Sequence, residues 1–151
     1  MLLAQISVAA GMVFERGLVL GMAEGRFPPR RLEDSLLPDV ERAASGGHLK
    51  QSTHRVHDDQ RDLLAVIAGA DHAALSHPRG DLRRSTQQPA SRWLLDDAAR
   101  LAGVSHLESS ALLTYSTQPW LTHVPSFAAG LAGQQTFATD QHLRLAAIAR
   151  G

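Results

Sequence analysis

The sequence predicts an α/β fold in which one or two parallel strands are followed by helices. A short apolar run ends the segment 14–21, and such a run closed by glycine is typical of a buried parallel strand. A helical pattern follows at 58–69, and a second apolar run at 73–77 is stopped by Pro78. A strand, a helix and another strand in this order favour a parallel sheet.

Capping signals define the expected helices. Asp58 or Asp59 is suited to cap a long helix that ends near Gly69. Its expected apolar face consists of Leu63, Leu64, Ile67 and Ala68. Ser91 is suited to cap another helix, which ends at Gly103. The expected buried stripe of that helix consists of Trp93, Leu94, Ala98 and Leu101. Shorter or weaker helices are expected at 38–42, 107–113, 126–131 and 140–148.

The composition limits the classes of function. The 151 residues are 44% apolar, which is enough for a domain with a core. The 15 basic and 15 acidic residues cancel, so any contact with DNA must be local. Cysteine is absent, which excludes thiolate chemistry and suits a cytoplasmic protein. No stretch reaches the roughly 18 apolar residues of a membrane helix, and the apolar start lacks the features of a signal peptide.

The loop at 22–29 is the main candidate for a functional segment. It carries glycine and two prolines, and it follows the carboxyl end of a predicted parallel strand, where open α/β sheets usually place ligand contacts. Basic residues flank both predicted strands, and we expect them either to approach a phosphate backbone or to be only solvated. These residues are Arg26, Arg30, Arg31, Arg79, Arg83 and Arg84.

Two motifs carry a resemblance to a known family. The segment 11–28 reads GMVFERGLVLGMAEGRFP, and it resembles in register the fifth conserved motif of UvrD/RecB-type superfamily 1 helicases, roughly SKGLEFDxVFVxGxxEGxFP. The segment 60–70 reads QRDLLAVIAGA and occupies the place of the sixth motif, roughly ERRLxYVAxTRA. The later segments LSHP (75–78) and PASRWL (89–94) are similar to a strand and a helix of RecB/AddB-like helicase-nucleases.

The resemblance is tight from Gly11 to Trp93 and only compositional afterwards. It implies that residues 1–88 are the carboxyl-terminal part of a second RecA-like motor domain of the P-loop NTPase type. Residues 89–151 are then a helical extension toward a nuclease domain, and the chain is expected to be an incomplete piece. The implied partners are DNA and a partner helicase-nuclease subunit, in DNA repair or recombination.

The resemblance also implies roles for particular residues. The DNA-contacting loop, which couples DNA to the nucleotide, consists of Glu24, Gly25, Arg26, Phe27 and Arg30. Phe27 is expected to stack on a base or to anchor the loop. Arg61 aligns with a family arginine and is expected to approach a nucleotide, the alternative being a solvated arginine on a helix.

The chain departs from the family at positions that carry chemistry. Ala9-Ala10 and Val13 stand where the fifth motif has Ser-Lys and Glu, and Gly69 stands where the sixth has arginine. Losing such an arginine removes about 10³ to 10⁵ in rate in related NTP hydrolases. The 151 residues contain neither a G-x-x-x-x-G-K-[ST] loop nor a nuclease signature. We therefore assign no catalytic residue and expect the isolated chain neither to hydrolyse ATP nor to cut DNA.

No cofactor is expected for this chain alone, although ATP and Mg²⁺ belong to the intact family. The densest histidine group pairs His54 with His57 at a spacing of three, whereas a helical metal pair normally needs a spacing of four. We therefore expect no metal site.

Two alternatives to the helicase interpretation stay open. One is a non-catalytic scaffold, derived from a motor, that holds DNA or a partner subunit. The other is a decayed remnant, which the losses at Ala10, Val13 and Gly69 favour.

Overall fold

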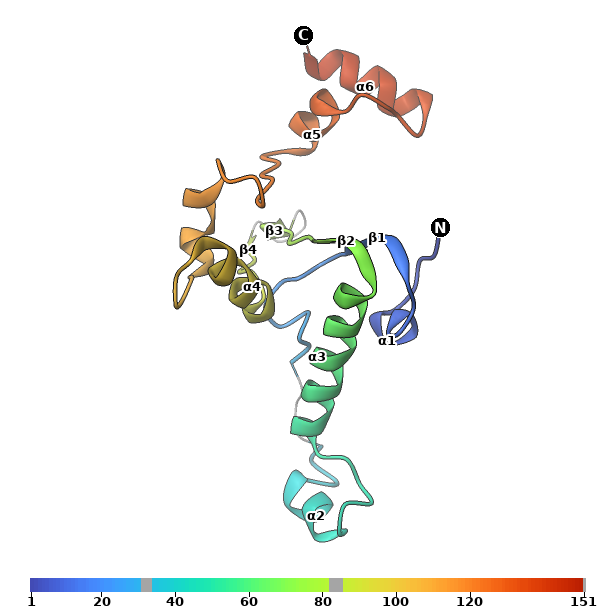
Figure 1. Ribbon diagram of the computed structural model, residues 1–151, viewed down its shortest axis with the longest axis vertical. Helices are drawn as coiled ribbons and strands as arrows, with labels where there is room; N and C mark the ends of the chain where they lie inside the picture. The colour runs from blue at the N-terminus through green and yellow to red at the C-terminus, as the bar shows by residue number, and fades with distance from the viewer. Residues whose placement is uncertain (31–33, 82–85, 151) are drawn as a thin grey trace. The chain divides into compact units, whose positions relative to one another are not determined.

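Figure 1 shows the chain as a computed structural model that describes residues 1–30, 34–81 and 86–150. The chain divides into two compact units, Met1–Ser109 and Ser110–Gly151. The first contains the parallel strands and the candidate loop, whereas the second is built from helices and the segments that join them. No helix within the described ranges is both long and apolar enough to cross a membrane.

A parallel pair of strands forms the sheet of the first unit. β1 (Phe14–Val19) lies beside β2 (Ala70–Leu75), with Phe14 opposite Ala70 and Val19 opposite Leu75. A small parallel sheet together with helices agrees with the predicted α/β class. β2 starts before the predicted 73–77 segment, because pairing with β1 begins directly after the preceding helix ends.

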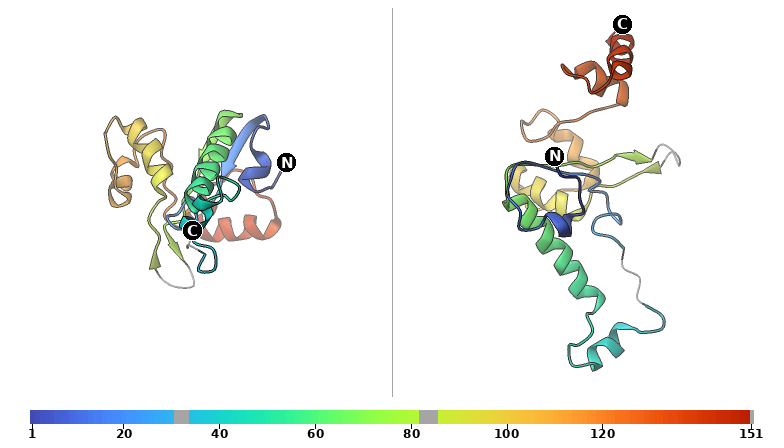
Figure 2. Two further views of the ribbon diagram at one scale, coloured as in Figure 1. Left: turned by 90° about the horizontal axis from the view of Figure 1, so that it is seen from below. Right: turned by 90° about the vertical axis from the view of Figure 1, so that its right-hand side faces the viewer.

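Two helices lie between the parallel strands in the sequence. α2 (Asp39–Ala44) follows Pro38, as predicted, and α3 (Ser52–Ala68) runs up to the start of β2 (Figure 2). The prediction that α3 begins at Asp58 or Asp59 is wrong. The Asp39 carboxylate accepts a hydrogen bond from the Ser52 amide at 3.0 Å and another from the Ser52 hydroxyl, and so satisfies a donor at the start of the helix.

The buried face of α3 differs from the predicted one. Leu63 and Val66, three residues apart, are buried, as one face of a helix requires. Leu64 is 51% exposed and Ala68 is exposed, so their predicted burial is wrong. Leu64 lies about 100° around the helix from Leu63, which turns it away from the core.

Helix α4 (Arg92–Ala102) agrees with its predicted caps. The Ser91 hydroxyl accepts a hydrogen bond from the Trp93 amide at 3.3 Å, and Gly103 ends the helix with a positive φ of 72°. Leu101, predicted to be buried, is 62% exposed. The contacts of α4 with the main core come from its first turn, and Leu101 lies in the last.

The main core of the first unit joins the strand, the loop, α3 and α4. Its buried members are Val19, Met22, Leu63, Val66 and Trp93. The two buried loop and helix side chains, Met22 and Trp93, hold the segment after β1 against the start of α4. The core therefore fixes the position of the candidate loop.

The remaining elements are short. They are α1 (Ile6–Ala9), the antiparallel strands β3 (Gly80–Asp81) and β4 (Thr86–Gln87), the 3₁₀ helix η1 (Ser109–Tyr115), α5 (Phe127–Gly133) and α6 (Asp140–Arg150). In the second unit, α5 and α6 are in contact, and the Arg150 guanidinium donates to the Ala132 carbonyl at 3.0 Å and to the Gln134 carbonyl. Predicted helices at 126–131 and 140–148 correspond to α5 and α6, and that at 107–113 overlaps η1.

The contact between Asp39 and Ser52 makes stability depend on pH. The two hydrogen bonds from Ser52 lower the pKa of Asp39 below its ordinary value. The stabilisation is therefore present above pH about 4 and is lost as the pH falls further. We expect Asp39→Asn to lower the urea midpoint near neutral pH, and the difference from the unchanged chain to shrink toward pH about 3. Asp71→Asn, at an exposed position on β2, is the control; equal changes would contradict the cap.

Candidate functional site

The loop at 22–29 leaves the carboxyl end of β1, as predicted. The Met22 amide donates to the Ser76 carbonyl at 2.8 Å, just beyond β2. The Met22 carbonyl accepts from the Ser91 amide at 2.9 Å, just before α4. The loop is therefore tied to the end of one strand and to the start of a helix.

A tight backbone turn gives the loop its shape. The amides of Arg26 and Phe27 both donate to the Ala23 carbonyl at 3.0 Å, and the Arg30 amide donates to the Gly25 carbonyl at 3.3 Å. Gly25 has a φ of 78°, which favours glycine. The side chains of Arg26 and Arg30 are both exposed. A compact turn thus carries two cationic residues on its outer side.

Glu24 is engaged within the protein. One carboxylate oxygen accepts from the Arg92 amide at 3.1 Å, and the other accepts from the Arg92 guanidinium at 3.1 Å. The Glu24 amide donates to the Pro89 carbonyl at 2.9 Å. A carboxylate at this position satisfies an amide in the first turn of α4 and lies at the positive end of the helix dipole.

Phe27 anchors the loop on the same helix. Its half-buried ring meets Trp93 edge to face, with ring centroids 5.2 Å apart, and Pro28 is fully buried beside it in the sequence. This packing matches the loop-anchor alternative stated for Phe27. Base stacking by the same ring stays a prediction.

Arg61 lies on α3 and is not brought together with the loop arginines. Its side chain is 72% exposed, and its guanidinium lies 3.1 Å from the Asp58 carboxylate and 4.0 Å from that of Asp62. These are pairs between neighbours on one helix, which contribute little in water. The nucleotide role of Arg61 stays a prediction.

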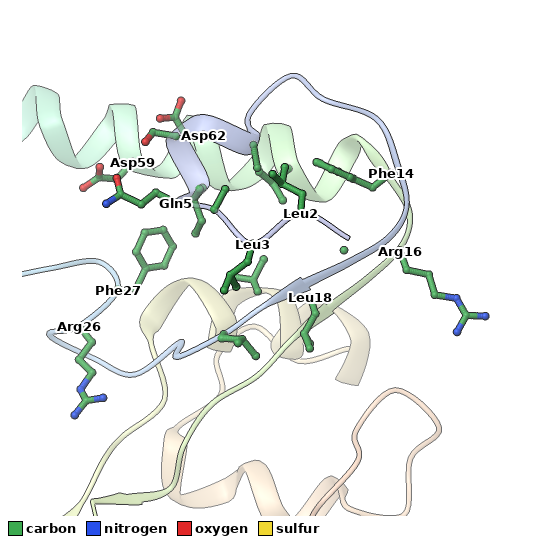
Figure 3. Close-up of a pocket in the computed structure, with 18 of the residues that line it drawn as sticks. Leu2, Leu3, Gln5, Phe14, Arg16, Leu18, Arg26, Phe27, Asp59 and Asp62 are labelled. Atoms are coloured by element: carbon green, nitrogen blue, oxygen red, sulfur yellow. The ribbon is translucent and has the colours of Figure 1, made fainter. Parts of the chain in front are cut away.

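An open cavity of about 650 Å³ lies against β1 (Figure 3). Residues from the amino-terminal segment, β1, the loop and α3 line it. Figure 3 shows apolar side chains, among them Leu3, Leu18 and Phe27, around the cavity, whereas Arg16 and Arg26 point outward. Sequence reasoning missed the contribution of residues 2–9; their apolar character was the signal.

Other candidates for binding chemistry are less organised. Within the described ranges, no three His, Cys, Asp or Glu side chains are grouped closely enough to hold a metal ion. Arg79 is exposed, whereas Arg31, Arg83 and Arg84 lie outside the described residues. The loop is therefore the segment in which the predicted contact residues are best defined.

Comparisons with known proteins identify no relative. No protein-family model matches the chain, and no curated protein and no solved structure is significantly similar to it. Function must therefore be argued from the geometry of the loop and from the motif pattern of the sequence.

Proposed function

We propose that the chain is part of the second RecA-like motor domain of an ATP-dependent DNA helicase or helicase-nuclease that acts in DNA repair or recombination. The loop at 22–30 is its DNA-contacting and coupling segment. The observation that carries this proposal is the position of the loop, at the carboxyl end of β1 in a parallel strand pair, with Arg26 and Arg30 exposed. Cytoplasm is the compartment that goes with this function.

The charge of the loop supports contact with a phosphate backbone. Arg92 neutralises Glu24, so Arg26 and Arg30 give the exposed loop a net positive charge. Cations of this kind contribute affinity without sequence preference. ATP and Mg²⁺ would be held by the first motor domain of the intact family, and hydrolysis would reach the DNA through this loop.

A non-catalytic scaffold is the second candidate, and Gly69 favours it. A Cβ atom at this position would lie 2.2 Å from the Met12 carbonyl oxygen, so the backbone there leaves no room for a side chain. The position that aligns with the family's arginine is thus closed. A motor without that cation loses about 10³ to 10⁵ in rate, whereas binding of DNA or of a partner subunit is unaffected.

Loss of the loop arginines tests the proposal. We expect the unchanged chain to bind single-stranded DNA weakly, and Arg26→Ala with Arg30→Ala to weaken binding about tenfold. The slope of log affinity against log salt should fall by about 1.4, since each phosphate contact to a single strand contributes about 0.7. Fluorescence anisotropy with a labelled oligothymidine at several salt concentrations measures both quantities.

Removal of the same charge elsewhere provides the control. Arg16 and Arg144 are both exposed, and neither belongs to the loop. If Arg16→Ala with Arg144→Ala weakens binding as much as the loop variant, the contact is not local and the proposal is wrong.

A further inference from the structure

We infer that Glu24 and Arg92 are positioning residues that fix the DNA-contacting loop on helix α4, so that loop and helix shift as one body when DNA engages the loop. The inference rests on the proposed function. It adds α4 as the element that receives the displacement of the loop. Glu24 acts through Arg26 and Arg30, whose position it sets, and does not itself face DNA.

Four hydrogen bonds join two segments that are 68 residues apart in the sequence. Two connect backbones, from the Glu24 amide to the Pro89 carbonyl at 2.9 Å and from the Ser91 amide to the Met22 carbonyl at 2.9 Å. The other two run from the Arg92 amide and guanidinium to the two oxygens of Glu24, each at 3.1 Å. Ala23 and Ala90 complete the contact as an antiparallel bridge.

An aromatic contact holds the loop from the apolar side. Phe27, which follows the turn, meets the buried ring of Trp93, the residue after Arg92. The polar and the aromatic contacts therefore fall on the same first turn of α4. A rotation of α4 about this turn must carry the loop with it, since both sides of the loop are attached there.

The charge of Glu24 gives the inference a sharp test. A carboxylate beside a DNA-binding loop repels phosphate, so its removal alone should strengthen DNA binding. A positioning role predicts the opposite sign. Glu24→Ala should weaken binding of the full-length chain to labelled oligothymidine about threefold to tenfold, which corresponds to the net loss of one hydrogen bond. The salt slope should stay unchanged, because Arg26 and Arg30 are retained.

Hydrogen exchange without DNA measures the attachment directly. We expect the amides of Glu24, Arg26 and Phe27 to exchange about tenfold faster in Glu24→Ala, since the loop opens more often. Glu24→Gln keeps one acceptor for Arg92 and should lie between the two. The matched control is Glu15→Ala, which removes the same charge from a side chain that is 85% exposed on β1. It should leave exchange unchanged and DNA binding equal or tighter.

Each outcome decides between the two claims. If Glu24→Ala binds DNA as tightly as the unchanged chain, or more tightly, the positioning role is overturned while the proposed function stands. If the unchanged chain does not bind DNA at all, the proposed function fails, and with it the role of Glu24 in DNA contact. Should Glu24→Ala unfold, by circular dichroism, Glu24→Gln decides in the same way.

Discussion

Trp93→Ala is expected to lower the free energy of unfolding of the Met1–Ser109 unit by about 3–5 kcal/mol, the range for a large aromatic side chain removed from a core. Trp93 is 8% exposed and packs with Val19, Met22 and Leu63. A small domain is stable by only about 5–15 kcal/mol, so the variant should be partly or wholly unfolded. Urea denaturation followed by far-ultraviolet circular dichroism measures the loss.

A second leucine on the same helix provides the control for this experiment. Leu101 is 62% exposed, so Leu101→Ala should change stability by no more than about 0.5 kcal/mol. Equal effects of the two substitutions would show that α4 does not pack through its first turn. Absence of a cooperative transition in the unchanged chain would instead support the decayed-remnant alternative and remove the basis of the comparison.

Local sequence signals were sufficient where the determinants of structure are themselves local. The caps of α4 lie directly beside it, at Ser91 and Gly103, and both act as predicted. β1 was found from an apolar run that closes on glycine, and Pro38 marked the start of α2. In each case, the residue that fixes the backbone is a neighbour in the sequence.

The failures arise where the determinant lies far along the chain. The start of α3 depends on Asp39, thirteen residues from Ser52, and no pattern within the helix indicates that contact. Leu64 and Leu101 satisfied an apolar pattern, but burial depends on where the neighbouring elements lie. The motif predicted that Glu24 belongs to the loop; its partner Arg92 became evident only from the fold.

Gly69→Ala is expected to destabilise the first unit by about 1–3 kcal/mol, the cost of inserting atoms into a packed site. The new Cβ would lie 2.2 Å from the Met12 carbonyl oxygen and 3.2 Å from that of Ala65, both of which are backbone atoms. The Gly69 carbonyl also accepts the Phe14 amide at 2.8 Å, where pairing of β1 with β2 begins. Any shift that relieves the clash therefore disturbs the sheet. Gly80→Ala, whose nearest contact would be at 3.8 Å, is the control for urea denaturation.

The same close approach decides whether a lost catalytic cation can be restored. Gly69→Arg would return the residue type of the family motif, yet its Cβ meets the same Met12 carbonyl before the guanidinium reaches any nucleotide. We expect Gly69→Arg to be destabilised at least as much as Gly69→Ala and to gain no ATP turnover. If both variants instead unfold at the same urea concentration as the unchanged chain, then Met12 moves at little cost. The closed position of residue 69 would then no longer favour a scaffold over a motor.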